Sequence, residues 1–289
     1  MLQPPLFDLP EPSHAGWHPR ELRRDGRYLS WMPPAELGDR LDATYYVITR
    51  RPERLLAALP CPLVPLAEWA DVNPPARRLP SERGFLLYER CCYAEIRDVR
   101  EDCWAVGPEL RSRAVRDLPT HASHQPEPGD ILLPRYTSSL HKAVVVRKTG
   151  QPLVASENFI LLQPRRWSVG PVLLALLHHR VLGEQLWALA TGTMKLAVAA
   201  GQVGELRVPQ LGEGTIEELG SLVERLIEAQ VMAAYPGTQF PLPLYWQDGT
   251  LSQWRVRSMA LAAEMERTLD RALYASEEVT WTPKPISAN

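Results

Sequence analysis

The last third of the sequence contains two long amphipathic stretches, which constrain the fold more than any other feature. In residues 215–235 apolar side chains recur at alternating spacings of three and four, the pattern of a helix that packs along one seam. A second stretch, residues 252–275, has a similar stripe along one side, at spacings of three or four residues. Thr215 and Glu218 have the spacing of a capping box, and Pro236 ends the first stretch. We therefore predict two helices that pack as an antiparallel pair.

The sequence leaves open which surface covers the apolar seam of these two helices. One alternative is a plain helical hairpin that closes the core of the chain itself. The other is an interface with a second subunit or a second copy, because neither helix is long enough to be stable without a partner surface. The side chains predicted for such a partner or dimer interface are Ile216, Leu219, Val223, Leu226, Leu261, Met265 and Leu269.

Short β-rich stretches precede the helices and are separated by Gly, Pro and Asp signals. They are Gly84–Leu87, Cys92–Ile96, Asp130–Leu133, Ala143–Arg147 and Phe159–Gln163. Helices are predicted over residues 46–58, interrupted by Pro52, and over residues 171–189. The predicted fold class is α+β: one mixed α/β domain with short strands, followed by a C-terminal, coiled-coil-like helical pair. The predicted domains are an N-terminal arm (1–40), the mixed domain (41–210) and a helical segment with a tail (211–289).

Composition and cysteine usage indicate a cytoplasmic protein. The chain of 289 residues is 45% hydrophobic and 23% charged, which is ordinary for a globular protein. It has no apolar run long enough for a transmembrane helix, and its N-terminus lacks the pattern of a secretory signal. None of the four cysteines forms a C-x-x-C pair, so we expect reduced, buried thiols. Because no apolar run is long enough to span a membrane, we also expect no association with a membrane.

The N-terminal arm contains one short motif. Gln3, Leu6 and Phe7 form a Q-x-x-L-F sequence, which resembles the peptides that bacterial proteins insert into the sliding clamp. The alternative is that this peptide docks on the chain's own domain.

Sequence patterns of the common DNA-modifying enzymes are absent. Asn73, Pro74 and Pro75 are followed by Ala76, which cannot stack on a flipped base as the aromatic residue of an amino-methyltransferase does, so we interpret them as a turn. No lysine has an acid two residues before it, and there is no P-loop, H-E-x-x-H or G-x-S-x-G motif. Adjacent histidines at 178 and 179 point in different directions on a helix, which argues against a metal site. We therefore expect no catalytic residues, metal or cofactor.

An ordered set of short motifs carries a resemblance to a known family. The strongest is Gly129–Arg135, which reads G-D-I-L-L-P-R, followed by Ala155–Ile160, which reads A-S-E-N-F-I. The others are Leu41–Tyr46, Pro62–Leu66, Ala70–Asn73, Tyr93–Val99, Ala190–Thr193 and Leu206–Pro209. In this order they resemble the target-recognition half of specificity subunits of type I restriction–modification systems. This chain has room for one recognition domain, whereas the full-length subunits carry two.

The resemblance implies sequence-specific recognition of double-stranded DNA without chemistry. Base and phosphate contacts are expected from the polar loop after Gly129, namely Arg135, Tyr136, Thr137, Ser138, Ser139 and Lys142. Secondary candidates for backbone contacts are Arg77, Arg78, Arg165, Arg166 and Lys195. The implied partners are an adenine-specific DNA methyltransferase subunit, a nuclease or translocase subunit, and a second copy of the chain.

Two other classes of function stay open. The chain could be a non-catalytic adaptor or scaffold in a defence or transposition complex that kept the recognition fold. It could also be a nuclease with an atypical site. Binding to randomised duplexes separates the reader from the adaptor, and incubation with DNA, Mg²⁺ and S-adenosylmethionine detects an enzyme.

Overall fold

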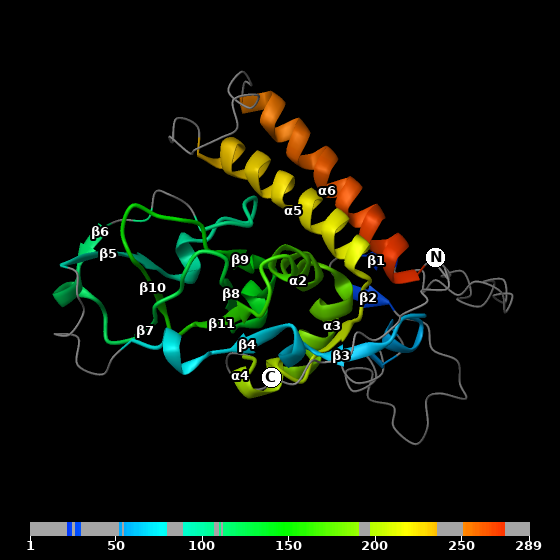
Figure 1. Ribbon diagram of the computed structural model, residues 1–289, viewed down its shortest axis with the longest axis horizontal. Coiled ribbons are helices and arrows are strands. Elements are labelled where there is room, and N and C mark those ends of the chain that lie inside the picture. The colour runs from blue at the N-terminus through cyan, green and yellow to red at the C-terminus, as the bar shows by residue number, and fades with distance from the viewer. Residues whose placement is uncertain are drawn as a thin grey trace, which may run out of the picture. The chain divides into compact units, whose positions relative to one another are not determined.

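The structure is a computed structural model that describes residues 22–24, 27–29, 52–53, 55–79, 89–106, 110, 112–190, 197–235 and 251–274 (Figure 1). The chain forms two compact units, residues 1–50 and residues 51–289. In the first unit, strands β1 (Leu22–Arg24) and β2 (Arg27–Leu29) pair antiparallel. The clamp-like peptide of Gln3, Leu6 and Phe7 lies outside the described residues, and so does the predicted strand at 84–87.

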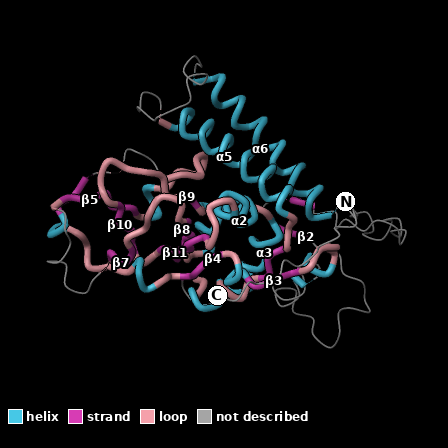
Figure 2. Tube along the Cα trace, viewed as in Figure 1, coloured by secondary structure: helices cyan, strands magenta, loops and turns pink. Residues whose placement is uncertain are grey.

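Short strands make up the β part of the second unit (Figure 2). They are β3 (Leu63–Pro65), β4 (Ala70–Val72), β5 (Arg90–Ala94), β6 (Ser112–Ala114), β7 (Ala122–His124), β8 (Ile131–Pro134), β9 (Val144–Val145), β10 (Leu153–Ser156), β11 (Phe159–Pro164) and β12 (Arg207–Pro209). One four-stranded sheet has the order β6-β5-β10-β7 and another the order β4-β11-β8-β9. Strands β5 and β10 run parallel, and the other neighbours are antiparallel. An antiparallel pair of β3 and β12 ties the start of the unit to the segment before the long helices.

Strands β8 and β11 separate two apolar cores. Their side chains are buried on both faces, which is why their sequences read as continuous apolar runs rather than as alternating patterns. Because successive side chains of a strand point to opposite faces, Ile131, Leu133, Ile160 and Leu162 enter the core under the helices. Leu132, Leu161 and Phe159 enter a second core toward the other four-stranded sheet. The strand pair therefore connects the β part to the helical part.

The predicted helix over 171–189 is wrong in one respect, because the structure has two helices there. Helix α2 (Val169–His178) and helix α3 (Arg180–Leu189) are separated at His179, whose backbone is extended. Its Nδ1 accepts a hydrogen bond from the N–H of Val181 at 3.3 Å, so the histidine caps the start of α3. Helix α2 is buried on all sides before the break, since the six successive side chains from Val172 to Leu177 are buried.

The two long C-terminal helices have nearly the predicted bounds and lie side by side (Figure 1). They are α5 (Glu213–Ala234) and α6 (Leu251–Tyr274), here called the helical pair. The predicted capping box is wrong, because α5 begins two residues before Thr215 and has Gly212 at its N-cap without a side-chain cap. Thr215 therefore lies within the first turn.

The remaining elements are short. Helix α4 spans Ala200–Val203, and the 3-10 helices are η2 (Leu66–Glu68), η3 (Pro75–Arg77), η5 (Ile96–Asp98), η6 (Val115–Asp117) and η7 (Thr137–Lys142). The turn predicted at residues 73–75 is confirmed, since Asn73 has a positive φ of 46°. Its Oδ1 accepts a hydrogen bond from the N–H of Leu161 at 2.7 Å. The predicted α+β class with a C-terminal helical pair is confirmed.

Candidate nucleic-acid interface

The polar loop predicted to meet DNA, residues 135–142, follows directly on the buried strand β8 and is here called the recognition loop. Hydrogen bonds on both sides hold its first residue: the N–H of Arg135 donates to the carbonyl of Asn158 at 3.0 Å. The carbonyl of Arg135 accepts from the N–H of Val198 at 2.9 Å. Tyr136 and Ala197 then form an isolated antiparallel bridge. The loop therefore begins at a position fixed by two segments that are distant in sequence.

The far end of the recognition loop is fixed by a histidine. His178 Nε2 lies 2.8 Å from the carbonyl oxygen of Ala143, the residue after η7, and donates to it. The imidazole stacks on Trp104 with ring centroids 3.9 Å apart and an interplanar angle of 7°. Burial lowers the pKa of His178 to about 4, so the ring is neutral at pH 7. The N–H of Trp104 in turn donates to Gln230 Oε1 on α5 at 3.0 Å.

The side chains of the recognition loop differ in their surroundings. Tyr136 donates its hydroxyl to Asn158 Oδ1 at 3.2 Å, and Arg135 is half-buried beside it. Ser138 is exposed, and Ser139 is half-buried with its N–H bonded to the carbonyl of Tyr136 at 2.9 Å. The side chain of Thr137 lies outside the described atoms. Because hydrogen bonds hold the backbone of the loop at both ends, the positions from which these side chains extend are fixed.

Lys142, at the end of the recognition loop, is engaged within the chain. Its Nζ lies 3.2 Å from Glu101 Oε1, and its side chain is only 20% exposed. His141 lies 3.7 Å from the same oxygen. The hydrogen bond from Lys142 lowers the pKa of Glu101 most, and the positive charge of Lys142 lowers it further. Of the two cationic side chains predicted for base contacts, only Arg135 forms no ion pair with the described residues.

Most of the secondary basic candidates also form ion pairs. Arg165 Nη2 lies 2.8 Å from Asp71 Oδ1, and Arg166 Nη1 lies 2.6 Å from Glu213 Oε1 on α5. Both pairs are about half exposed. Lys195 lies outside the described residues. A neighbouring carboxylate cancels much of the field of each guanidinium, so these residues attract phosphates less than free arginines would.

Arg77 and Arg78 lie side by side in sequence but differ in exposure. Arg77 is largely buried, and its guanidinium contacts Glu127 and lies with its Nε 3.2 Å from Asp130 Oδ2. Arg78 is exposed, and its backbone forms a bridge with His124. The structure therefore places Arg77 inside the fold and leaves Arg78 available at the surface.

The Gly129-Asp130 dipeptide of the strongest motif has a structural role. Gly129 has a φ of 94°, which other residues rarely adopt, and a Cβ atom there would lie 2.5 Å from Cζ3 of Trp167. Asp130 Oδ2 accepts a hydrogen bond from the N–H of Glu127 at 2.8 Å and faces Arg77. Burial raises the pKa of Asp130, and the hydrogen bond and Arg77 oppose that shift. The dipeptide turns the chain into β8.

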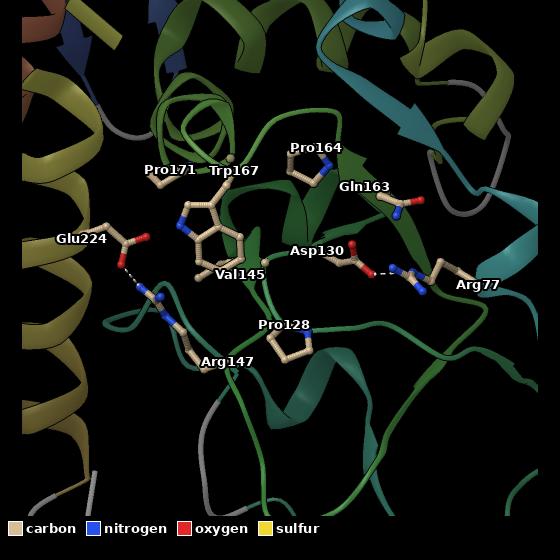
Figure 3. Close-up of a pocket in the computed structure, with 12 residues that line it drawn as sticks. Arg77, Pro128, Asp130, Val145, Arg147, Gln163, Pro164, Trp167, Pro171 and Glu224 are labelled. Atoms are coloured by element: carbon tan, nitrogen blue, oxygen red, sulfur yellow. Dashed lines mark hydrogen bonds and ion pairs between the residues drawn. The ribbon is translucent and has the colours of Figure 1, made fainter. Parts of the chain in front are cut away.

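A cavity of about 140 Å³ lies beside this turn (Figure 3). Two ion pairs line it on different sides, Arg77 with Asp130 and Arg147 with Glu224 of α5. The indole of Trp167, which is 68% exposed, lies between them. Each charged side chain that lines the cavity therefore already has a partner of opposite sign.

All seven side chains predicted for a partner interface are buried within the single chain. They lie in the core that joins the helical pair to α2, at 0–7% exposure. Burial at this level requires no second subunit, so it agrees with the alternative of a helical hairpin that closes the chain's own core. A partner would therefore have to contact other residues of the pair.

The four cysteines lie in buried or half-buried positions of the fold. Cys91, Cys92 and Cys103 are buried, Cys61 is half-buried, and all four are free thiols. Burial raises the pKa of each. Within the described ranges, no group of three or more His, Cys, Asp or Glu side chains is arranged to hold a metal ion. None of the helices in the described part of the chain is long and apolar enough to cross a membrane.

Comparisons with known proteins give likeness in structure alone. No family model and no curated protein matches this chain. A chain from a structural study of complex assembly and conformational transition of the type I R-M system is similar with a TM-score of 0.48 and 18% identity. The HsdS subunit from Thermoanaerobacter tengcongensis is similar with a TM-score of 0.45 and 15% identity. In both cases 62% of this chain is matched, and it spans about half of the other chain (51%).

Two residues of the site were missed by the sequence reasoning. Asn158 holds both Arg135 and Tyr136, yet in the sequence it is only the fourth residue of the A-S-E-N-F-I motif. Trp167 is exposed beside two arginines, and the R-R-W run before α2 was the available signal. An exposed indole offers a flat face to nucleic-acid bases.

Proposed function

We propose that the chain is a sequence-specific DNA-recognition subunit of a restriction–modification or related phage-defence complex. It reads duplex DNA without chemistry and directs a partner methyltransferase or nuclease to the site. The recognition loop carries this proposal. It combines a backbone fixed at both ends with a guanidinium, a phenol and hydroxyls, the groups that contact base edges and phosphates.

The distribution of charge limits how the proposed contact with DNA works. The chain carries a net charge of −2, and four of the cationic candidates are in ion pairs. Few condensed counterions are then released on binding, so affinity depends on close contacts more than on long-range attraction. Arg135 and Arg78 are the strongest candidates for those contacts. We expect a shallow dependence of binding on salt concentration compared with a strongly basic DNA-binding protein.

Selection from randomised duplexes tests the proposal directly. The purified chain, alone and with candidate methyltransferase subunits, is incubated with the pool, and bound DNA is sequenced over several rounds. A reader enriches one family of sites. A pool that stays random would overturn the proposal, and binding without enrichment favours the adaptor.

A second experiment tests whether the chain itself cleaves or modifies DNA. The same protein is incubated with plasmid DNA, Mg²⁺ and S-adenosylmethionine, first alone and then with the partner. Modification or cleavage only when the partner is present supports a directing role. Activity of the chain alone would overturn the non-catalytic assignment and favour the atypical nuclease.

A further inference from the structure

The last residues of the recognition loop already hold an anionic group of their own chain. Lys142 Nζ lies 3.2 Å from Glu101 Oε1, and His141 Nε2 lies 3.7 Å from the same oxygen. Lys142 and His141 are the last two residues of η7, whereas Glu101 belongs to the segment after η5. One carboxylate oxygen therefore faces two nitrogens of a loop that is predicted to meet the phosphates of DNA.

The segment that carries Glu101 is anchored to the long helix α5. On one side of Glu101, the guanidinium of Arg100 lies 5.7 Å from the centroid of the Tyr235 ring, at the end of α5. On the other side, the N–H of Trp104 donates to Gln230 Oε1. The side chain of Glu101 is itself 69% exposed, so it can rotate away from the loop while its backbone stays in place.

The same end of the loop shares a side with one of the predicted DNA contacts. In a 3-10 helix the side chains three residues apart lie one above the other, so His141 lies in line with Ser138 in η7. Ser138 is exposed, and the side chain of His141 is 56% exposed. A DNA strand that contacts Ser138 would therefore bring its backbone close to His141 and Lys142.

The Glu101 carboxylate has the charge and the donor requirements of a backbone phosphate. Each phosphodiester of DNA carries one negative charge and two terminal oxygens, as the carboxylate does. If Glu101 kept its place, its charge would repel an approaching phosphate. If it rotates away, Lys142 exchanges one ion pair for another, and the net gain in affinity is small.

We propose that Lys142 and His141 form a site for one backbone phosphate of duplex DNA, and that Glu101 occupies this site in the free chain and is displaced when DNA binds. This inference rests on the proposed function, which supplies the DNA. It makes Glu101 a residue that limits affinity, because every contact through this site must first break an ion pair within the chain.

Glu101→Gln tests the displacement, because it removes the charge and keeps the size of the side chain. Fluorescence anisotropy with the selected duplex should show roughly two- to five-fold tighter binding than the wild type at low salt. The gain should shrink as salt rises, because salt weakens the ion pair that only the wild type has to break. Glu264→Gln, at an exposed position of α6, removes the same charge elsewhere and should leave the affinity nearly unchanged. Circular dichroism checks that both variants are folded.

The coupling between Glu101 and Lys142 separates displacement from a general effect of charge. Lys142→Gln should remove most of the gain in the Glu101→Gln background, whereas alone it should weaken binding only slightly. A gain that persists without Lys142, or a gain no larger than that of Glu264→Gln, would overturn the inference and leave the Lys142–Glu101 pair with a structural role.

Inorganic polyphosphate, which offers phosphates without bases, separates this inference from the proposed function. In isothermal titration calorimetry Glu101→Gln should bind polyphosphate more tightly than the wild type, and Lys142→Gln should abolish the difference. Both gains, with duplex and with polyphosphate, in a chain that enriches no sequence would keep the phosphate site and overturn sequence-specific reading alone. Equal binding of both ligands by the wild type and Glu101→Gln would overturn the site, whether or not the chain enriches a sequence.

Discussion

The recognition loop and the helical pair are held in different ways. In the loop, hydrogen bonds to the backbone of Arg135 and to the carbonyl of Ala143 define the shape, and Ser138 is left exposed. In the helical pair the side chains define the shape, because the seam is buried at 0–7% exposure. Substitutions in the loop should therefore change binding more than stability, and substitutions in the seam should do the reverse.

The largest expected effect is on stability, in the seam. Leu226→Ala removes a fully buried side chain between α5 and its neighbours, and such changes cost about 2–5 kcal/mol. Ser221→Ala, at an exposed position of α5, should change the free energy of unfolding by less than about 0.5 kcal/mol. Urea unfolding monitored by circular dichroism measures both. An effect of Leu226→Ala that vanished at low protein concentration would mean that the seam needs a second subunit after all.

The next effect concerns His178, which lies where the two regions meet. Its folded-state pKa of about 4 is below the ordinary value of about 6.5, so the unfolded chain takes up the proton more readily. This contribution to stability is complete above about pH 6.5 and is lost as the pH falls toward 4. Between pH 6.5 and 5 the loss from this residue is up to about 2 kcal/mol.

Urea unfolding at several pH values measures this dependence. His178→Gln, which keeps a donor for the Ala143 carbonyl, should flatten the curve in this range. Burial also lowers the pKa of His179 and of His124, so part of the dependence should remain. Identical slopes for the variant and the wild type would show that His178 is not responsible.

The third prediction separates the two cations of the recognition loop. Arg135→Gln should weaken binding to a selected DNA site by about 1–3 kcal/mol if the guanidinium contacts a base. Lys142→Gln should weaken it less, because Glu101 already neutralises that charge. Fluorescence anisotropy at several salt concentrations measures both, and circular dichroism checks that each variant is folded. Unchanged affinity and salt dependence for both variants would remove the loop from the interface.

The sequence predicted the elements whose patterns are local. The apolar runs of β8 and β11 and the heptad-like spacing of the helical pair gave their positions to within a few residues. The break at His179 was missed because an apolar run before and after it looks continuous, while the histidine caps α3 with its own side chain. Which surface covers the seam depends on packing between distant segments, and no local pattern contains that.

The same reasoning explains why the role of Asn158 could not be predicted. Its carbonyl and its side chain hold two residues that lie more than twenty positions earlier in the chain. Tyr136 and Asn158 meet only because β8 and β11 pair with Phe159 opposite Pro134. Register, rather than composition, therefore connects the strongest motif to the A-S-E-N-F-I motif.

The smallest expected effect tests that connection. Asn158→Ala removes the acceptor of the Tyr136 hydroxyl but keeps the backbone bond to Arg135, so we expect a loss of about 1 kcal/mol in stability. Tyr136→Phe removes the same bond from the other side. If the two residues act through this bond, the double variant should lose less than the sum of the single variants, both in stability and in DNA affinity. Strict additivity would show that the loop keeps its shape without the side chain of Asn158, and would assign the support from the β10–β11 turn to the backbone bond between Asn158 and Arg135.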